Sequence, residues 1–181
     1  MLAIDQSFLE LVLHPLGKPP IDPNSKKPIE ALAERIEELI DGWDTDRETV
    51  IIPTPALAQF LILAHHEASE YLSRISTAPF FKVEPFDERA AVELAAVQIK
   101  LGSTASGRRK RGPQEGTWAK VNFDRQIVAV AKVNNVSAIY SDDNGLGKFA
   151  NQMGIDCIHS WDLPTPQPRQ QPFVFVEPAE E

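Results

Sequence analysis

Short apolar runs alternate along the chain with longer segments in which apolar residues recur at helical spacing. The short runs are rich in β-branched and aromatic residues and predict strands, which we place at residues 2–5, 50–52, 80–83, 138–140 and 155–159. The clearest helical pattern follows Pro28, a residue suited to the first turn of a helix, and places Ile29 and Ile36 on one face. We therefore expect strands and helices to alternate.

Capping residues set the expected limits of the other helices. Thr54 and Pro55 form an N-cap and first-turn pair, Asp87 caps the next helix, and Gly154 ends a short one. Further helices are expected just after the first strand and over residues 118–134. Such an alternation requires a mostly parallel sheet covered by helices on both faces. The predicted fold class is therefore α/β.

The composition is that of an ordinary globular domain with more acidic than basic residues. The chain has 181 residues, a formal net charge of -8 and a sequence pI of about 5.0, and this length suits a single core. We assign residues 1–163 to one domain and residues 164–181 to a Pro- and Gln-rich acidic tail. An acidic protein needs a local basic patch to bind nucleic acid. The candidate patch, which could also be only a solvated loop, is Arg108, Arg109, Lys110 and Arg111.

The single cysteine and the apolar content bear on the compartment. Cys157 excludes an internal disulfide framework and fits a reducing environment. We expect this residue to pack as a small apolar side chain. No apolar run approaches the ~20 residues of a membrane span, and the first residues lack the basic segment of a signal peptide. The expectation is a soluble cytoplasmic protein.

Several aspartates stand where a parallel sheet could bring them together. They are Asp5 after the first predicted strand, Asp124 early in the helix at 118–134, and Asp142 and Asp143 directly after the strand at 138–140. In open α/β sheets, ligands bind at the carboxyl ends of the strands. Neighbouring carboxylates repel and raise each other's pKa, and a divalent cation that prefers oxygen ligands relieves that cost. The pattern predicts a cation site.

Most of these acids also have a simpler interpretation. The run 142–145 is typical of a polar turn, because Asp and Asn bond locally to the backbone. Asp124 could be a solvated first-turn acid favoured by the helix dipole. Asp5 is harder to explain in this way, because it interrupts an apolar segment. Lys120, one turn before Asp124, is either half of a surface ion pair of little energetic value or a phosphate contact.

Taken in order, four segments resemble a PIN domain, most closely the VapC-like ribonucleases of toxin–antitoxin pairs and their single-domain relatives. Asp5-Gln-Ser7 is similar to the family's opening Asp-x-Ser/Asn, and Ser141-Asp-Asp143 to its Thr/Ser-x-Asp motif. Pro53–Phe60 resembles the helix start that normally carries a Glu. Phe123–Ala131 resembles the helix with an Asp in its first turns. Together the resemblance covers residues 1–163.

This resemblance implies a three-layer α/β/α PIN-like fold and metal-assisted hydrolysis of RNA. Asp5, Asp124 and Asp143 would ligate Mg²⁺ or Mn²⁺, with Asp142 acting through a water or facing solvent. Ser7 would be a polar partner near the site. The metal would activate a water and stabilise the charge that develops on the phosphate. A toxin of this kind would be blocked by a small antitoxin protein, and a homodimer formed through helices is also implied.

Gln59 stands where the family pattern predicts a Glu. Glutamine keeps the shape, but it cannot neutralise a cation or act as a base. On a straight helix, Glu67 is rotated roughly 80° off the face of Gln59 and Glu70 lies about 16 Å further along, so neither replaces it without a helix break. The two candidate functions are a weakened endoribonuclease and a catalytically inactive module that binds RNA or protein. A naturally weakened enzyme and one altered to disable it would carry the same residue.

Overall fold

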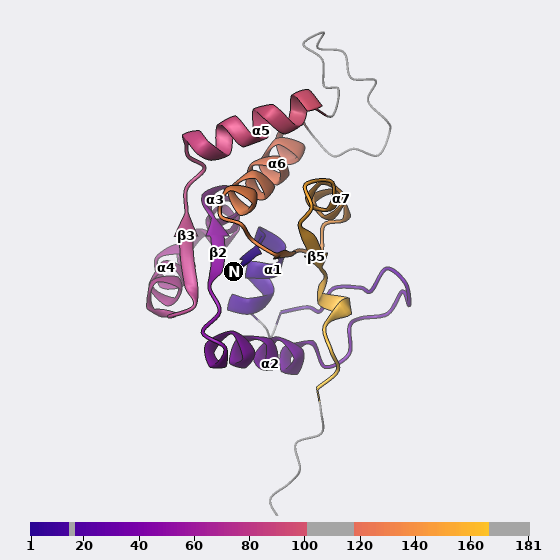
Figure 1. Ribbon diagram of the computed structural model, residues 1–181. Helices are drawn as coiled ribbons and strands as arrows, with labels where there is room; N and C mark the ends of the chain where they lie inside the picture. Colours follow the sequence, from indigo (N-terminus) through magenta and orange to yellow (C-terminus); the bar gives the residue numbers. More distant parts are fainter. Residues whose placement is uncertain (15–16, 101–117, 167–181) are drawn as a thin grey trace, which may run out of the picture.

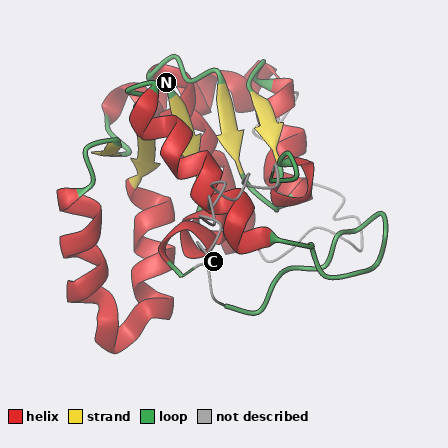
Figure 2. Cartoon of the chain, turned by 90° about the horizontal axis from the view of Figure 1, so that it is seen from below, coloured by secondary structure: helices red, strands yellow, loops and turns green. Residues whose placement is uncertain are grey.

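A five-stranded sheet forms the centre of the protein in the computed structural model, which describes residues 1–14, 17–100 and 118–166 (Figure 1). The strands are β1 (Leu2–Ile4), β2 (Val50–Pro53), β3 (Phe81–Glu84), β4 (Ala138–Tyr140) and β5 (Asp156–Ile158). Their spatial order is β3-β2-β1-β4-β5, and every neighbouring pair is parallel. Figure 2 shows the arrows of the central strands side by side and pointing the same way. The parallel sheet expected from the sequence is confirmed.

Helices connect and cover these strands. In the described residues they are α1 (Gln6–Leu13), α2 (Leu32–Thr45), α3 (Thr54–Ala64), α4 (Ala68–Thr77), α5 (Glu88–Lys100), α6 (Trp118–Val133) and α7 (Asn144–Gln152), with the 3-10 turns η1 (His65–Glu67) and η2 (Ser160–Asp162). Figure 1 shows α2 on one side of the sheet and α5 and α6 on the other. None of the helices in the described ranges is both long and apolar enough to cross a membrane.

Successive strand residues point into two separate apolar layers. Ala3 and Ile51 pack with Ile127 of α6 in one cluster. Ile4 packs with Phe8 of α1 in the other cluster. This alternation is what a strand buried on both faces requires, because its side chains point to opposite sides in turn. The three-layer α/β/α arrangement implied by the family resemblance is confirmed.

The strand order creates a switch point between β1 and β4. From β1 the chain moves outward in one direction to β2 and β3, and later returns to place β4 and β5 on the other side of β1. In open α/β sheets a crevice forms outside the carboxyl ends of the strands at such a point, and ligands bind there. Asp5 follows β1 and Asp142 follows β4, so the predicted acidic residues lie at this edge.

One helix begins later than predicted. Pro28 does not start α2; it forms an isolated antiparallel bridge with Ile21. Ala31 then has a left-handed backbone, with a φ of 51°, and α2 begins at Leu32. The local rule for proline is overridden because the chain folds back on itself here, with the N–H of Ile29 bonded to the carbonyl of Pro20.

Two capping predictions had different outcomes. Asp87 caps α5 as expected, since its Oδ1 accepts a 3.0 Å hydrogen bond from the N–H of Ala90. Thr54 is not the N-cap of α3, because Pro53 holds that position. The Thr54 hydroxyl instead accepts a 3.0 Å hydrogen bond from the N–H of Phe86. It therefore ties the start of α3 to the segment that leaves β3.

Cys157 on β5 packs against α7, as expected for a small apolar side chain. A Cβ atom placed on Gly147 of α7 would lie 3.0 Å from the Cys157 sulfur, so the glycine allows the helix to approach the strand closely. Burial, followed by the charges of Asp5 and Asp142, raises the pKa of the thiol to about 12. Because the thiolate is the nucleophilic form, this thiol is unreactive at neutral pH.

Candidate active site

Asp5 is buried at the carboxyl end of β1, with 5% of its surface exposed. It is the N-cap residue of α1, and its Oδ1 accepts a 2.8 Å hydrogen bond from the N–H of Phe8. That N–H has no partner within the helix, which is why an aspartate is favoured here. The Ser7 hydroxyl donates to the same oxygen at 2.8 Å. Asp5 and Ser7, both predicted site residues, are therefore in direct contact.

Ser141 joins the ends of β1 and β4. Its fully buried hydroxyl donates a 2.6 Å hydrogen bond to Oδ2 of Asp5 and accepts a 3.0 Å hydrogen bond from the N–H of Asp143. One serine thus connects two of the predicted metal ligands. Sequence reasoning placed Ser141 inside a motif without assigning it a role. The available signal was a serine at the end of an apolar strand, directly before two aspartates.

Asp143 is the N-cap residue of α7 and faces α6. Its Oδ1 accepts hydrogen bonds from the backbone N–H groups of Gly145 at 2.6 Å and Leu146 at 3.0 Å. Its Oδ2 forms an ion pair with Nζ of Lys120, in the first turn of α6. This ion pair links α6 to α7, and the two helices pack against each other.

Asp124 reaches the same region from α6. Burial, and then the negative charge of Asp143, raise its pKa to about 6 from 3.8, while the charge of Lys120 acts in the opposite direction. The charge of Asp5 also raises the pKa of Asp124. A charge shifts the pKa of a carboxyl group in this way only from nearby. The structure therefore brings Asp5, Asp124 and Asp143 into one electrostatically coupled group.

The ionisation of the other two acids differs because their partners differ. Burial raises the pKa of Asp5 to about 6, against the hydrogen bonds from Ser141, Phe8 and Ser7 that favour the charged form. Burial also acts to raise the pKa of Asp143, but the hydrogen bond from Lys120 and those from the α7 backbone outweigh it, so the pKa of Asp143 is lowered. The charged form is therefore disfavoured at Asp5 and Asp124 and favoured at Asp143.

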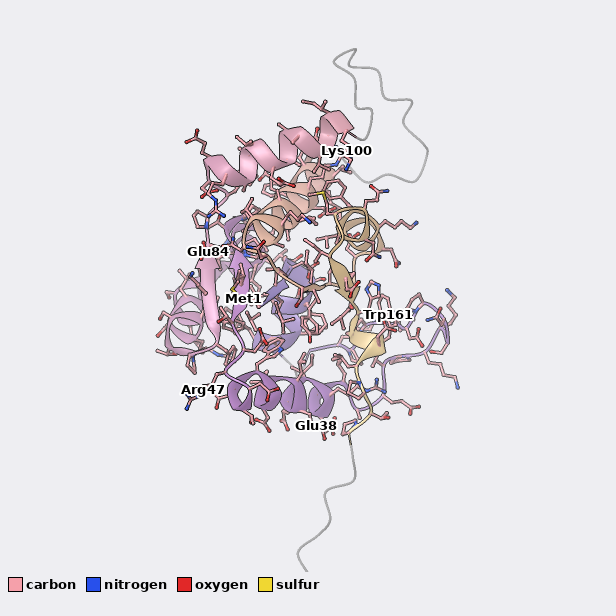
Figure 3. The ribbon with its side chains drawn as sticks, in the orientation of Figure 1. Met1, Glu38, Arg47, Glu84, Lys100 and Trp161 are labelled. Atoms are coloured by element: carbon pink, nitrogen blue, oxygen red, sulfur yellow. The ribbon has the colours of Figure 1, made fainter. Side chains whose placement is uncertain are left out.

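The carboxylate of Asp142 is bonded to the chain after β5, and its charge also raises the pKa of Asp5. Its Oδ1 accepts a 2.7 Å hydrogen bond from the N–H of Ser160, and its Oδ2 accepts a 2.6 Å bond from the Ser160 hydroxyl. Ser160 begins the η2 turn, beside Trp161, which is labelled in Figure 3. In the structure both carboxylate oxygens therefore fix the chain after β5, whereas a water-mediated or solvent-facing role had been expected. The difference arises because β5 lies next to β4 in the sheet.

Gln59 lies in α3, half-buried, beside the buried Phe60. Helix α3 packs against α1 and α6, which are the helices that begin at Asp5 and carry Asp124. Gln59 is therefore on a helix adjacent to the acids. In the part of the chain that the structure describes, no hydrogen bond joins its side chain to another residue.

Helix α3 does break before Glu67 and Glu70, but the break does not bring either acid to the site. His65 has a φ of 46°, and α3 ends there. Glu67 and Glu70 then lie near Tyr71, whose pKa is raised by burial first and by these two acids next. Figure 1 shows α4 beside β3, at the edge of the sheet away from β5 and α7. Neither acid replaces the missing Glu.

The residues predicted to contact RNA fall into two groups. Ser7 and Lys120 lie at the acidic group, through their contacts with Asp5 and Asp143. The basic run of residues 108–111 and the tail beyond residue 166 lie outside the described residues.

A divalent cation is consistent with the chemistry of this group. Its donors are carboxylate oxygens, the ligand type that Mg²⁺ and Mn²⁺ prefer, and they come from Asp5, Asp124 and Asp143. In the described ranges, no three His, Cys, Asp or Glu side chains are placed closely enough to hold a metal ion. The ammonium group of Lys120 is paired with Asp143 instead. The residue types therefore fit a metal. In the structure, the ammonium of Lys120 offsets part of the negative charge of these carboxylates.

Comparisons with known proteins identify a family. The model of the PIN domain family matches residues 28–152, which is more than half of the chain. A comparison with curated protein sequences finds no match.

Solved structures share the fold at low sequence identity. A chain of DNA-bound VapBC from Salmonella typhimurium is 15% identical with a TM-score of 0.52, over 88% of this chain and 97% of that one. A chain of FitAB bound to the IR36 DNA fragment is 18% identical with a TM-score of 0.53, over 92% and 100%. A chain of VapBC2 from Rickettsia felis, bound to a DNA fragment from their promoter, is 9% identical with a TM-score of 0.54, over 87% and 97%.

Proposed function

Because this chain belongs to the PIN domain family, whose members are generally nucleases, we propose that it is a metal-dependent endoribonuclease and the toxin of a toxin–antitoxin pair. The observation that carries the proposal is the coupling of Asp5, Asp124 and Asp143 at the switch point of the sheet. The charges of Asp143 and Asp5 raise the free energy cost of ionising Asp124, and this arrangement is useful when a cation relieves that cost.

Asp5, Asp124 and Asp143 would hold Mg²⁺ or Mn²⁺. When bound, the metal supplies activation of a water and stabilisation of the charge that develops on the phosphate. The chain's own contribution is to position the ligands. Ser141 and Ser7 hold the Asp5 carboxylate, so it does not have to be ordered during the reaction.

Gln59 weakens this site in the proposal. An amide in place of a carboxylate removes one negative charge, and with it attraction for the cation. The same residue favours the alternative function, a PIN-like module that has lost catalysis and binds RNA or protein. The two functions differ in one outcome, which is whether Gln59→Glu raises the rate of RNA cleavage or leaves only binding.

An antitoxin partner is part of the proposal. The similar solved structures are of VapBC and FitAB complexes, which supports a protein partner for this chain as well. We place the protein in the cytoplasm, with RNA as its substrate, and include a homodimer formed through its helices. A small protein that covers the acidic group would block access of both cation and RNA.

A cleavage assay with Mn²⁺ and single-stranded RNA tests the proposed function. The wild-type chain should cleave, and Asp5→Asn or Asp124→Asn should lower the rate by about a hundredfold or more, which is ~2.7 kcal/mol of barrier. Asp156→Asn on β5 is the matched control, because it makes the same substitution at an exposed position. Cleavage that survives Asp5→Asn, or no cleavage together with no Mn²⁺ binding by calorimetry, would overturn the nuclease proposal.

A further inference from the structure

We propose that Lys120 is a built-in competitor of the divalent cation: its ammonium holds Asp143 when no cation is bound and leaves when one binds. The inference rests on the proposed metal-dependent function and concerns the same site. Its starting point is the ion pair between Nζ of Lys120 and Oδ2 of Asp143, which joins α6 to α7.

The hydrogen bonds of Asp143 leave one of its two oxygens for a cation. Each carboxylate oxygen can accept about two hydrogen bonds, and Oδ1 of Asp143 already accepts from the N–H groups of Gly145 and Leu146. These bonds cap α7 and keep the carboxylate in one orientation. Oδ2 is thus the oxygen that can ligate a cation, and Lys120 holds it. A divalent cation and the ammonium would repel each other at this oxygen, so they compete for it.

Lys120 is placed to act on the whole acidic group. The hydrogen bond with Asp143 raises the pKa of Lys120, burial lowers it, and the charges of Asp143, Asp124 and Asp5 raise it further. The lysine therefore stays charged at neutral pH and leaves the site as a cation. Its side chain is 55% exposed, and its flexible four-carbon stem can carry the ammonium into solvent. The structure thus provides both the contact and a route away from it.

The inference explains how this domain tolerates an incomplete metal site. Asp5 and Asp124 both have a pKa raised to about 6, so their charges carry a free energy cost. An ammonium within the group offsets part of that cost in the metal-free protein. Lys120 and the neutral Gln59 act in the same direction, because each reduces the net negative charge that a divalent cation meets.

Calorimetric titration of the full chain with Mn²⁺ tests the proposal. Lys120→Met removes the charge and keeps an unbranched stem, and we expect it to bind Mn²⁺ about tenfold more tightly. Lys120→Arg keeps the charge and should change the affinity by no more than about threefold. Lys148→Met is the matched control, because it removes the same charge from an exposed position on α7. It should change the affinity by no more than about twofold.

A measurement on the wild-type chain makes the test independent of the folding of the variants. NMR signals of the Lys120 side chain, assigned by their loss in Lys120→Arg, should shift when Mg²⁺ is added, while those of Lys148 should not. Unchanged Lys120 signals, or unchanged affinity in Lys120→Met while Asp5→Asn still abolishes Mn²⁺ binding, would overturn this inference alone. If neither the wild type nor Lys120→Met binds Mn²⁺, both the inference and the proposed function fail.

Discussion

Ser141 and Asp5, which are 136 positions apart in the sequence, are joined by a 2.6 Å hydrogen bond between Oγ of Ser141 and Oδ2 of Asp5. Both residues are buried, and the bond ties the end of β4 to the end of β1. The same hydroxyl accepts a hydrogen bond from the N–H of Asp143. A single serine therefore orients two of the three acids of the candidate site.

Removal of this hydroxyl should affect both stability and metal binding. In Ser141→Ala, a buried carboxylate loses a donor, and we expect the free energy of unfolding to fall by about 1–3 kcal/mol. Mn²⁺ affinity should fall as well, because Asp5 and Asp143 lose their common support. Urea unfolding and calorimetry measure the two effects. Ser73→Ala, at an exposed position of α4, should stay within about 0.5 kcal/mol of the wild type.

Restoring the missing acid should increase activity. We expect Gln59→Glu to raise the rate of RNA cleavage with Mn²⁺ by about tenfold or more, equivalent to ~1.4 kcal/mol of barrier. The physical reason is an added negative charge on α3, which packs against α1 and α6. Gln152→Glu adds the same charge at an exposed position of α7 and should leave the rate unchanged. RNA binding without cleavage in Gln59→Glu would favour the inactive binding module.

Asp142 should behave as a structural residue. Asp142→Ala removes both hydrogen bonds to Ser160, and we expect a loss of about 1–3 kcal/mol in the free energy of unfolding. Mn²⁺ affinity should remain within about threefold of the wild type, since both oxygens are already bonded to Ser160. The opposite pattern, normal stability with lost Mn²⁺ binding, would show that Asp142 turns to the metal.

The raised pKa values predict how stability depends on pH without metal. Asp5 and Asp124 each have a folded-state pKa of about 6 against an ordinary value of 3.8. Between these values the folded chain binds more protons than the unfolded chain, so these two groups make stability fall as pH rises. Asp143 has a lowered pKa and titrates below this window, where its contribution to stability is lost as pH falls.

Urea unfolding in EDTA checks this sign. The free energy of unfolding of Asp5→Asn minus that of the wild type should increase as pH rises from about 4 to about 6.5, because the variant has lost one of the two titrations. Asp156→Asn, an exposed control, should give a constant difference over the same range. Parallel curves for Asp5→Asn and the wild type would contradict the raised pKa of Asp5.

Local residue patterns were sufficient for most of the fold. The strand at 138–140 and the cap at Asp87 were predicted closely, because strand runs and helix caps depend on neighbours a few residues away. Pro28 shows where this reasoning fails. Its bridge to Ile21 joins the two ends of a loop, and that contact overrides the local preference of proline for the first turn of a helix.

The sequence by itself determined which acids stand at the carboxyl ends of β1 and β4, because that placement follows from where each apolar run ends. Only the tertiary structure decided where their oxygens point. Asp142 faces Ser160, and Asp143 faces Lys120, although the two aspartates are adjacent in the chain. Each direction depends on a partner from another element, brought close by the pairing of β5 with β4 and the packing of α6 against α7. The spacing of residues in the sequence does not reveal that packing.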